Sequence, residues 1–182
     1  MLNRNNHLLT LKLNLQWAVA KPRPLVGTLK PAALKRLAAN TLSLATKELE
    51  QSAALSTFKG SKLTLEVPIR ITSQEEIKAL NRNFRRVDEP TNVLSFPCDE
   101  SAWLKSKTTR ELGDLVICAD VVSLEATLGA IKLEDHWAHI LVHGLLHLLG
   151  LDHITPKPRR YMQHLEGRIL SASGYANPHP EV

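Results

Sequence analysis

The sequence predicts an α+β fold, in which a mixed sheet of four strands packs against about five helices in a single domain over residues 1–182. Three observations carry this prediction. The first two are that strand-like and helix-like patterns interleave along the chain and that no stretch is long or polar enough to separate two domains. The third is composition, because 182 residues that are 43% hydrophobic and 23% charged suffice for one buried core. A tail over residues 173–182, with two prolines, is expected to be loose.

The strands are predicted from apolar residues that alternate with polar ones. Such alternation covers residues 8–18, and a second alternating run covers residues 63–71. A third, short strand over residues 92–96 ends before Pro97. The apolar run over residues 115–118 reads as a fourth strand, short and buried. These four segments supply the predicted sheet.

Helix signals fill the segments between and after the strands. Pro31 suits a first helical turn, Ser73 opens a capping box, and Asp120 can cap a helix that Gly129 ends. The polar residues 98–111 are expected to form a loop. The predicted helices run from about Pro31 to Leu49, from Ser73 through Phe84, from Asp120 through Leu128, over 133–149 and over 158–171. The resulting order of elements is β-α-β-α-β-β-α-α-α.

Three histidines lie within eleven residues of the chain, at His143, His147 and His153. Residues four apart share a helix face, so the first two side chains can point at one metal ion. Gly150 lies where the helix would end, because glycine adopts the left-handed conformation of helix C-termini at little cost. The chain can then turn and bring His153 back as a third ligand. Three protein ligands with a fourth position open are typical of a catalytic zinc site.

Zinc is the expected metal, one ion per chain, although nickel and cobalt accept the same ligand types. The ligand spacing is that of the extended zinc-protease motif, so the expected fold is zincin-like. That motif has a glutamate base directly after the first histidine, where this chain has Gly144. Asp152 is a candidate to orient His153, with a turn role equally open. His139, four residues before His143, is a candidate to support the metal ligands from outside or to lie on the surface.

The composition also bounds the partners and the location. A net charge of +5 favours an anionic partner such as nucleic acid. Cys98 and Cys118 lie in apolar stretches without CxxC spacing, and we expect buried, reduced thiols. No segment approaches the ~18 apolar residues of a membrane span, and the N-terminus lacks a signal-peptide core. We therefore expect a cytoplasmic protein that does not bind membranes.

Other motifs accompany the histidines in a fixed order. They are Leu80-Asn81-x-x-Phe84-Arg85, Pro90-Thr91-Asn92-Val93-Leu94-Ser95-Phe96-Pro97, Leu112-Gly113-Asp114-Leu115-Val116-Ile117 and His136-Trp137-Ala138-His139. Together with the histidine run, they resemble the YbeY family of bacterial endoribonucleases. The resemblance covers about residues 60–175, the motif-bearing core of a metal-hydrolase domain.

The resemblance implies a zinc-dependent endoribonuclease specific for single-stranded RNA. It also implies a role in 16S rRNA 3′-end maturation and in ribosome quality control. The implied partners are ribosomal RNA, the small ribosomal subunit and ribosome-associated proteins. The metal histidines of the family correspond to His143, His147 and His153.

The functional arginine of the family corresponds to Arg85, whose planar guanidinium suits a phosphate. The family usually continues with a glycine and a basic residue, whereas this chain has Arg86-Val87. Arg86 is thus a second candidate for contact with RNA. An ion pair of Arg85 with Asp88 or Glu89 is the alternative.

Two other classes of function stay open on the residues alone. The ligand spacing allows a metalloprotease-like peptide hydrolase, against which Gly144 counts. A non-catalytic ribosome-assembly factor with structural zinc would need a fourth protein ligand, such as Cys98 or Cys118. The sequence does not choose between a 5′-phosphate and a cyclic phosphate as product, and it fixes neither the general base nor the oligomeric state.

Overall fold

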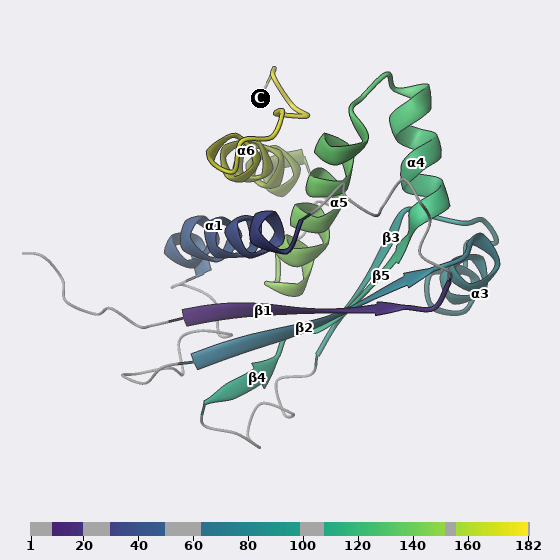
Figure 1. Cartoon of the computed structure of the whole chain (residues 1–182), viewed down its shortest axis with the longest axis horizontal. Helices are drawn as coiled ribbons and strands as arrows, with labels where there is room; N and C mark the ends of the chain where they lie inside the picture. The colour runs from purple at the N-terminus through teal and green to yellow at the C-terminus, as the bar shows by residue number, and fades with distance from the viewer. Residues whose placement is uncertain (1–8, 20–29, 50–62, 99–107, 152–155, 182) are drawn as a thin grey trace, which may run out of the picture.

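The structure is a computed structural model of the chain, which describes residues 9–19, 30–49, 63–98, 108–151 and 156–181. Within these residues a mixed sheet of five strands packs against five helices, and Figure 1 shows the arrangement. The predicted α+β class is therefore confirmed. Among the described residues, no helix is long and apolar enough to cross a membrane.

The sheet has the strand order β1-β2-β5-β3, with β4 paired to β2. Strands β1, β2 and β5 run parallel, and β3 runs antiparallel to β5. The strands are β1 (Leu9–Trp17), β2 (Leu63–Thr72), β3 (Val93–Pro97), β4 (Thr109–Glu111) and β5 (Gly113–Cys118). The four predicted strands form the main path of the sheet. The fifth, β4, corrects the expectation of a loop over 98–111, because Thr64 N donates to Thr108 O and Leu112 N to Glu66 O at its two ends.

The helices begin close to where their signals predict. They are α1 (Pro31–Leu49), α3 (Gln74–Arg85), α4 (Ala119–Leu128), α5 (Leu133–Leu148) and α6 (Pro156–Ala172). The capping box forms, because Ser73 Oγ accepts a hydrogen bond from Glu76 N at 3.3 Å. Asp120 does not cap α4: Cys118 is the N-cap residue, and Asp120 lies in the first turn. The N-cap lies two residues earlier than expected because β5 runs directly into the helix.

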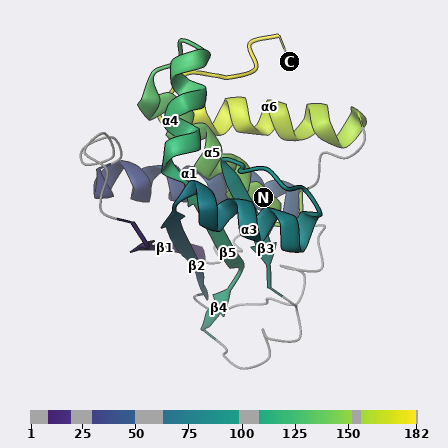
Figure 2. The same ribbon diagram turned by 90° about the vertical axis from the view of Figure 1, so that its right-hand side faces the viewer.

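The residues of β5 alternate between two hydrophobic clusters. Leu115 and Ile117 belong to the main core, which α1, α5 and α6 cover. Val116 and Cys118 point to the other face, where they pack with Ile77 of α3 in a smaller cluster. Figures 1 and 2 show α1, α5 and α6 on one side of the sheet and α3 apart from them. The sheet is thus covered unevenly, and α5 lies in the middle of the thicker layer.

Helix α5 presents the predicted metal ligands His143 and His147 on a face that is only partly buried. From His136 to Leu148 every residue is buried except His139, His143 and His147, which are partly buried. These three residues are four apart and therefore share one helix face. Gly150 follows the helix with φ +89°, the left-handed conformation that the sequence predicts for it.

The last described residues fold back against α5 and α6. Sequence reasoning expected a loose tail, but here Ala176 N donates to Asp135 Oδ1 at 3.1 Å. Asn177 lies directly on α6 at Gly167, where an added Cβ would be 2.5 Å from Asn177 Oδ1. These contacts place the segment beside the histidine face of α5.

Candidate metal site and RNA-contact residues

His143 and His147 face each other across one turn of α5. Their Nε2 atoms lie 3.2 Å apart, and their ring centroids are 4.6 Å apart. Two nitrogens each about 2.0–2.1 Å from one tetrahedral zinc ion would be separated by about 3.3 Å. The pair therefore has the spacing of two ligands of one ion. His153 and Asp152 lie outside the described residues.

Glu166 of α6 fixes the orientation of His143. The Nδ1 atom of His143 lies 2.8 Å from Glu166 Oε1, and Glu166 is only 2% exposed. With the Nδ1 proton donated to the carboxylate, Nε2 is left to offer its lone pair to a metal. Such a carboxylate behind a ligating imidazole sets its tautomer and raises its basicity. The donor set at this position thus fits a zinc ion.

The charge on Glu166 is held by the histidines around it. Burial raises the pKa of this carboxyl, but hydrogen bonds and charge from His139 and His143 outweigh burial. The net effect keeps the pKa of Glu166 well below its usual range. The residue is therefore an anion at neutral pH, and it accepts hydrogen bonds from His143 and His179.

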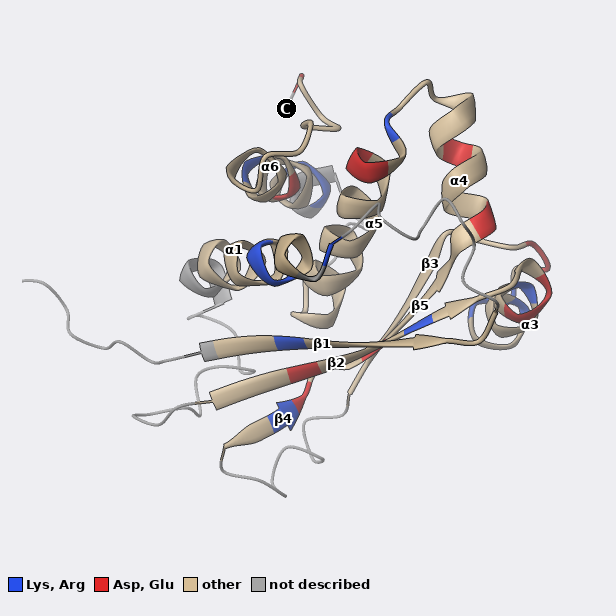
Figure 3. Cartoon of the chain, viewed as in Figure 1, with Lys and Arg blue, Asp and Glu red and all other residues tan. Residues whose placement is uncertain are grey.

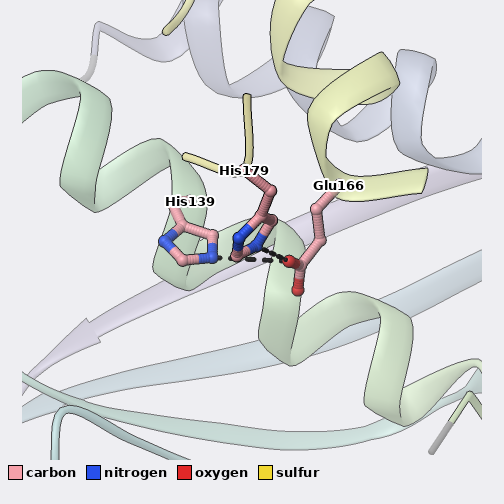
Figure 4. A group of neighbouring side chains, drawn as sticks. All are labelled: His139, Glu166 and His179. Carbon is pink, nitrogen blue, oxygen red and sulfur yellow. Dashed lines mark hydrogen bonds and ion pairs between the residues drawn. The ribbon is translucent and has the colours of Figure 1, made fainter. Parts of the chain in front are cut away.

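Two further histidines converge on the same carboxylate (Figure 4). The Nε2 atom of His179, from the C-terminal segment, lies 2.7 Å from Glu166 Oε2. The Nε2 atom of His139 lies 3.5 Å from the same oxygen. The structure thus places His139 outside the predicted metal position but in contact with a residue that supports it.

Gly144 has no room for the glutamate of the zinc-protease motif. A Cβ at this position would lie 2.9 Å from Leu115 Cδ2 and 3.4 Å from Val93 Cγ2. The helix face at Gly144 therefore packs directly on the sheet and points away from the histidine face. A glutamate placed here would enter the core and would not reach a substrate at the metal.

Arg85 extends from the end of α3 to the strand beside the metal helix. Its Nη2 donates to Ser95 O at 3.3 Å, and Ser95 Oγ donates to Gly144 O at 3.4 Å. Ser95 of β3 therefore connects Arg85 to the backbone of α5 through two hydrogen bonds. Asp88, one partner of the alternative ion pair, lies 3.7 Å from Lys78 Nζ and 3.8 Å from Arg82 Nη1.

Arg86 ends helix α3 in the left-handed conformation, with φ 64° and ψ 25°. Its backbone N–H donates to Asn81 O, and the side chain of Asn81 donates to Glu89 O at 2.8 Å. This is the position at which the resembled family usually has glycine. The conformation explains that preference, because only glycine adopts positive φ at no steric cost.

Other residues of the quoted motifs hold the framework together. His136 Nε2 lies 2.8 Å from Glu125 Oε2, and Asn92 Nδ2 donates to the same carboxylate at 3.0 Å. These contacts join α4, α5 and the start of β3. His136 is therefore a buried structural residue, separate from the face that carries His143.

The cysteines are both free and neither joins the histidines. Cys118 is buried in the smaller cluster with Ile77 and Leu94, where burial raises the pKa of its thiol. Cys98 is partly exposed after β3. Among the described residues, the group able to hold a metal is made of histidines and one glutamate. A sulfur ligand, which a structural zinc site would call for, is not part of it.

Sequence reasoning missed Glu166 and His179. Glu166 had a signal, because it stands alone as an acid on the apolar side of α6. Its neighbours on that side are Met162, Leu165 and Ile169, all buried. An acid in such a stripe needs a buried partner. His179 had no comparable signal, since only the folded tail brings it to α6.

Comparisons with known proteins agree on one family. The model of the family described as "Endoribonuclease YbeY" matches residues 29–174 of this chain. The chain is 49% identical over 116 residues to Endoribonuclease YbeY of Halorhodospira halophila, which covers 64% of this chain and 75% of the relative. It is 40% identical over 138 residues to Endoribonuclease YbeY of Legionella pneumophila strain Corby, with coverage of 76% and 86%.

A solved structure, the solution structure of TM1509 from Thermotoga maritima, aligns with 21% identity and a TM-score of 0.48. The alignment covers 91% of this chain and 97% of TM1509. The match to the family model over most of the chain and the identity to its members settle the relationship. The chain belongs to the YbeY family of endoribonucleases.

Proposed function

We propose that this chain is a zinc-dependent endoribonuclease specific for single-stranded RNA, with zinc held by His143, His147 and His153. The observation that supports the proposal most is the facing pair of Nε2 atoms, 3.2 Å apart, behind which Glu166 holds His143. A zinc ion bound there would supply a Lewis acid for a phosphoryl oxygen and make a bound water more acidic.

In this proposal the protein side chains orient the substrate and complement its charge. Cleavage of a phosphodiester develops negative charge on the nonbridging oxygens, which a guanidinium stabilises. Arg85 is suited to this task because its bond to Ser95 O holds the guanidinium beside α5. Its planar fork of donors matches two phosphate oxygens.

Basic residues on two helices supply the wider RNA contact. Figure 3 shows basic residues on α3 and α6, whereas the charged residues of α4 are both acidic. Arg82 and Arg86 are exposed at the end of α3, and Arg159 and Arg160 are exposed near the start of α6. We assign these residues to the RNA backbone, whose phosphates attract arginine regardless of sequence.

We further propose the 3′ end of 16S rRNA as the substrate in the cytoplasm, together with a role in ribosome quality control. The small ribosomal subunit and its associated proteins are the proposed partners. Membership of the YbeY family supports this assignment, and the net charge of +5 suits an RNA partner.

Cleavage of matched RNAs tests the proposal. The zinc-loaded protein is incubated with a labelled single strand that ends in the 16S rRNA 3′ sequence and with the same strand annealed to its complement. We expect cutting of the single strand and protection of the duplex. A His147→Ala variant purified in parallel controls for contaminating nuclease. Equal cutting of both RNAs, or equal cutting by the variant, would refute the proposal.

A further inference from the structure

His139, Glu166 and His179 form a second group of possible metal ligands beside the first. One ligand atom from each residue lies within 4.8 Å of the others. The three side chains come from α5, α6 and the C-terminal segment, and Figure 4 shows them pointing toward one another. The group therefore closes only when the tail is folded back.

The distances in this group are short enough for one ion to bind all three side chains, because the ligand atoms lie within 4.8 Å of one another. The 3.5 Å between His139 Nε2 and Glu166 Oε2 is too long for a good hydrogen bond. Nitrogen and oxygen ligands of one tetrahedral zinc ion lie about 3.3 Å apart. The 2.7 Å between His179 Nε2 and the same oxygen is a hydrogen bond, and this pair would move apart by about 0.6 Å to share an ion. The two separations together bracket the spacing that a common ion requires.

The chemistry of the group is that of an open metal site. Two histidines and one glutamate are a known ligand set for zinc with a fourth position free. A cavity of about 170 Å³ adjoins the three side chains, and His143, Arg159 and Gln163 also line it. The cavity leaves room for a fourth ligand, and Arg159 favours an anionic or neutral one.

The two oxygens of Glu166 serve different partners. Oε1 accepts from His143 Nδ1, whereas Oε2 is the atom that both His139 and His179 approach. An ion on Oε2 would thus leave the support of His143 in place. This division lets the group hold its own ion beside the position between His143 and His147, although both positions depend on Glu166.

His179 is held ready for this role by its own segment. Its backbone N–H donates to Asn177 Oδ1 at 2.9 Å, and Asn177 is seated on Gly167 of α6. Ala176 N is bonded to Asp135 at the start of α5. A ligand held in place before binding loses little conformational freedom when the ion arrives.

We propose that His139, Glu166 and His179 bind a second divalent ion of the zinc type, adjacent to and distinct from the ion assigned to His143 and His147. The alternative is that His179 only donates a hydrogen bond that positions Glu166. The two differ in metal stoichiometry, which can be measured without any RNA.

The test is zinc content per chain. The full-length protein is stripped with a chelator, equilibrated with zinc chloride, freed of loose metal and analysed by inductively coupled plasma mass spectrometry. We expect two zinc ions per chain in the wild type, one in His147→Ala and one in His179→Gln. His179→Gln keeps an N–H donor for Glu166 but removes the imidazole ligand. His164→Ala is the control, because His164 is an exposed histidine on α6, the helix that carries Glu166. This variant should keep two zinc ions.

Three outcomes would overturn or redirect the account in distinguishable ways. Two ions retained in His179→Gln would refute the second site, as would a single ion in the wild type that only His147→Ala removes. A single ion that only His179→Gln removes would support the group described here and count against the site at His147. Circular dichroism of each variant shows whether a lost ion reflects a lost fold.

Discussion

At the scale of single residues, the candidate site depends on side chains that hold one another. Glu166 fixes His143, and Ser95 links Arg85 to the backbone of α5. The histidine spacing predicts the pair that faces each other, and the arginine follows from the family motif. The carboxylate behind them was not predicted, because its partner is 23 residues away and on another helix.

Replacing Arg85 by alanine tests its assignment to the phosphate. We expect cleavage of single-stranded RNA to fall by about 10²–10³-fold, the usual effect of removing one donor from a developing charge. Zinc content should not change, since within the described residues Arg85 donates to the backbone of Ser95 and not to His143 or His147. Single-turnover cleavage and metal analysis measure the two quantities.

The matched control is Arg82→Ala, because Arg82 is exposed on the same helix and pairs with Asp88 at 3.8 Å. The Arg82→Ala variant should lose only the small part of its RNA affinity that one contact with the RNA backbone contributes. Equal losses in both variants would assign Arg85 to general RNA binding and contradict a role at the reacting phosphate.

Replacing Arg86 by glycine relieves a strained backbone position. The residue has φ 64°, which costs an L-amino acid about 1–2 kcal/mol. Glycine loses more freedom on folding, so we expect a net rise of about 1 kcal/mol in the free energy of unfolding. Urea denaturation measures this rise. Arg82→Gly, within the same helix, should lower the free energy of unfolding by about 1 kcal/mol. A lower free energy of unfolding in Arg86→Gly would contradict the inference that the backbone at Arg86 is strained.

At the scale of elements, alternation and capping signals predict most of the architecture. The strands β1, β2, β3 and β5 and the helix start at Ser73 follow directly from them. Strand β4 could not be predicted, because three residues are too few to show a period. Asp120 was expected to cap α4, yet the start of that helix is set by the buried strand before it.

The close packing of α5 on the sheet makes a prediction at the scale of elements. Gly144→Glu restores the glutamate of the zinc-protease motif but places it against Leu115 and Val93. We expect the free energy of unfolding to fall by about 3 kcal/mol or more, from overpacking and a buried charge. We expect no peptidase activity. Thermal denaturation and a peptide-library assay check both.

A glutamate at an exposed site controls for the charge itself. Leu128 of α4 is 78% exposed, and Leu128→Glu should change stability by no more than about 0.5 kcal/mol. A stable, proteolytic Gly144→Glu variant would contradict the packing of α5 and reopen the peptidase alternative.

At the scale of the whole molecule, the site forms where α5, α6 and the C-terminal segment pack against one another. Helix α5 supplies the facing histidines His143 and His147, and α6 supplies Glu166. The C-terminal segment supplies His179, which lies against Glu166 (Figure 4). The main core beneath them joins α1, α5 and α6 to one face of the sheet. Sequence patterns describe each element by itself, so they could not place three elements around one carboxylate.

The measurement that tests the central claim most directly is the RNA cleavage rate against bound zinc. Protein stripped by a chelator is titrated with zinc, and the rate on a single-stranded RNA is recorded together with the zinc content. The account predicts no cleavage without metal, recovery as zinc binds, and no recovery in His147→Ala at any zinc content. Cleavage that continues in the stripped protein, or that returns in His147→Ala, would contradict it.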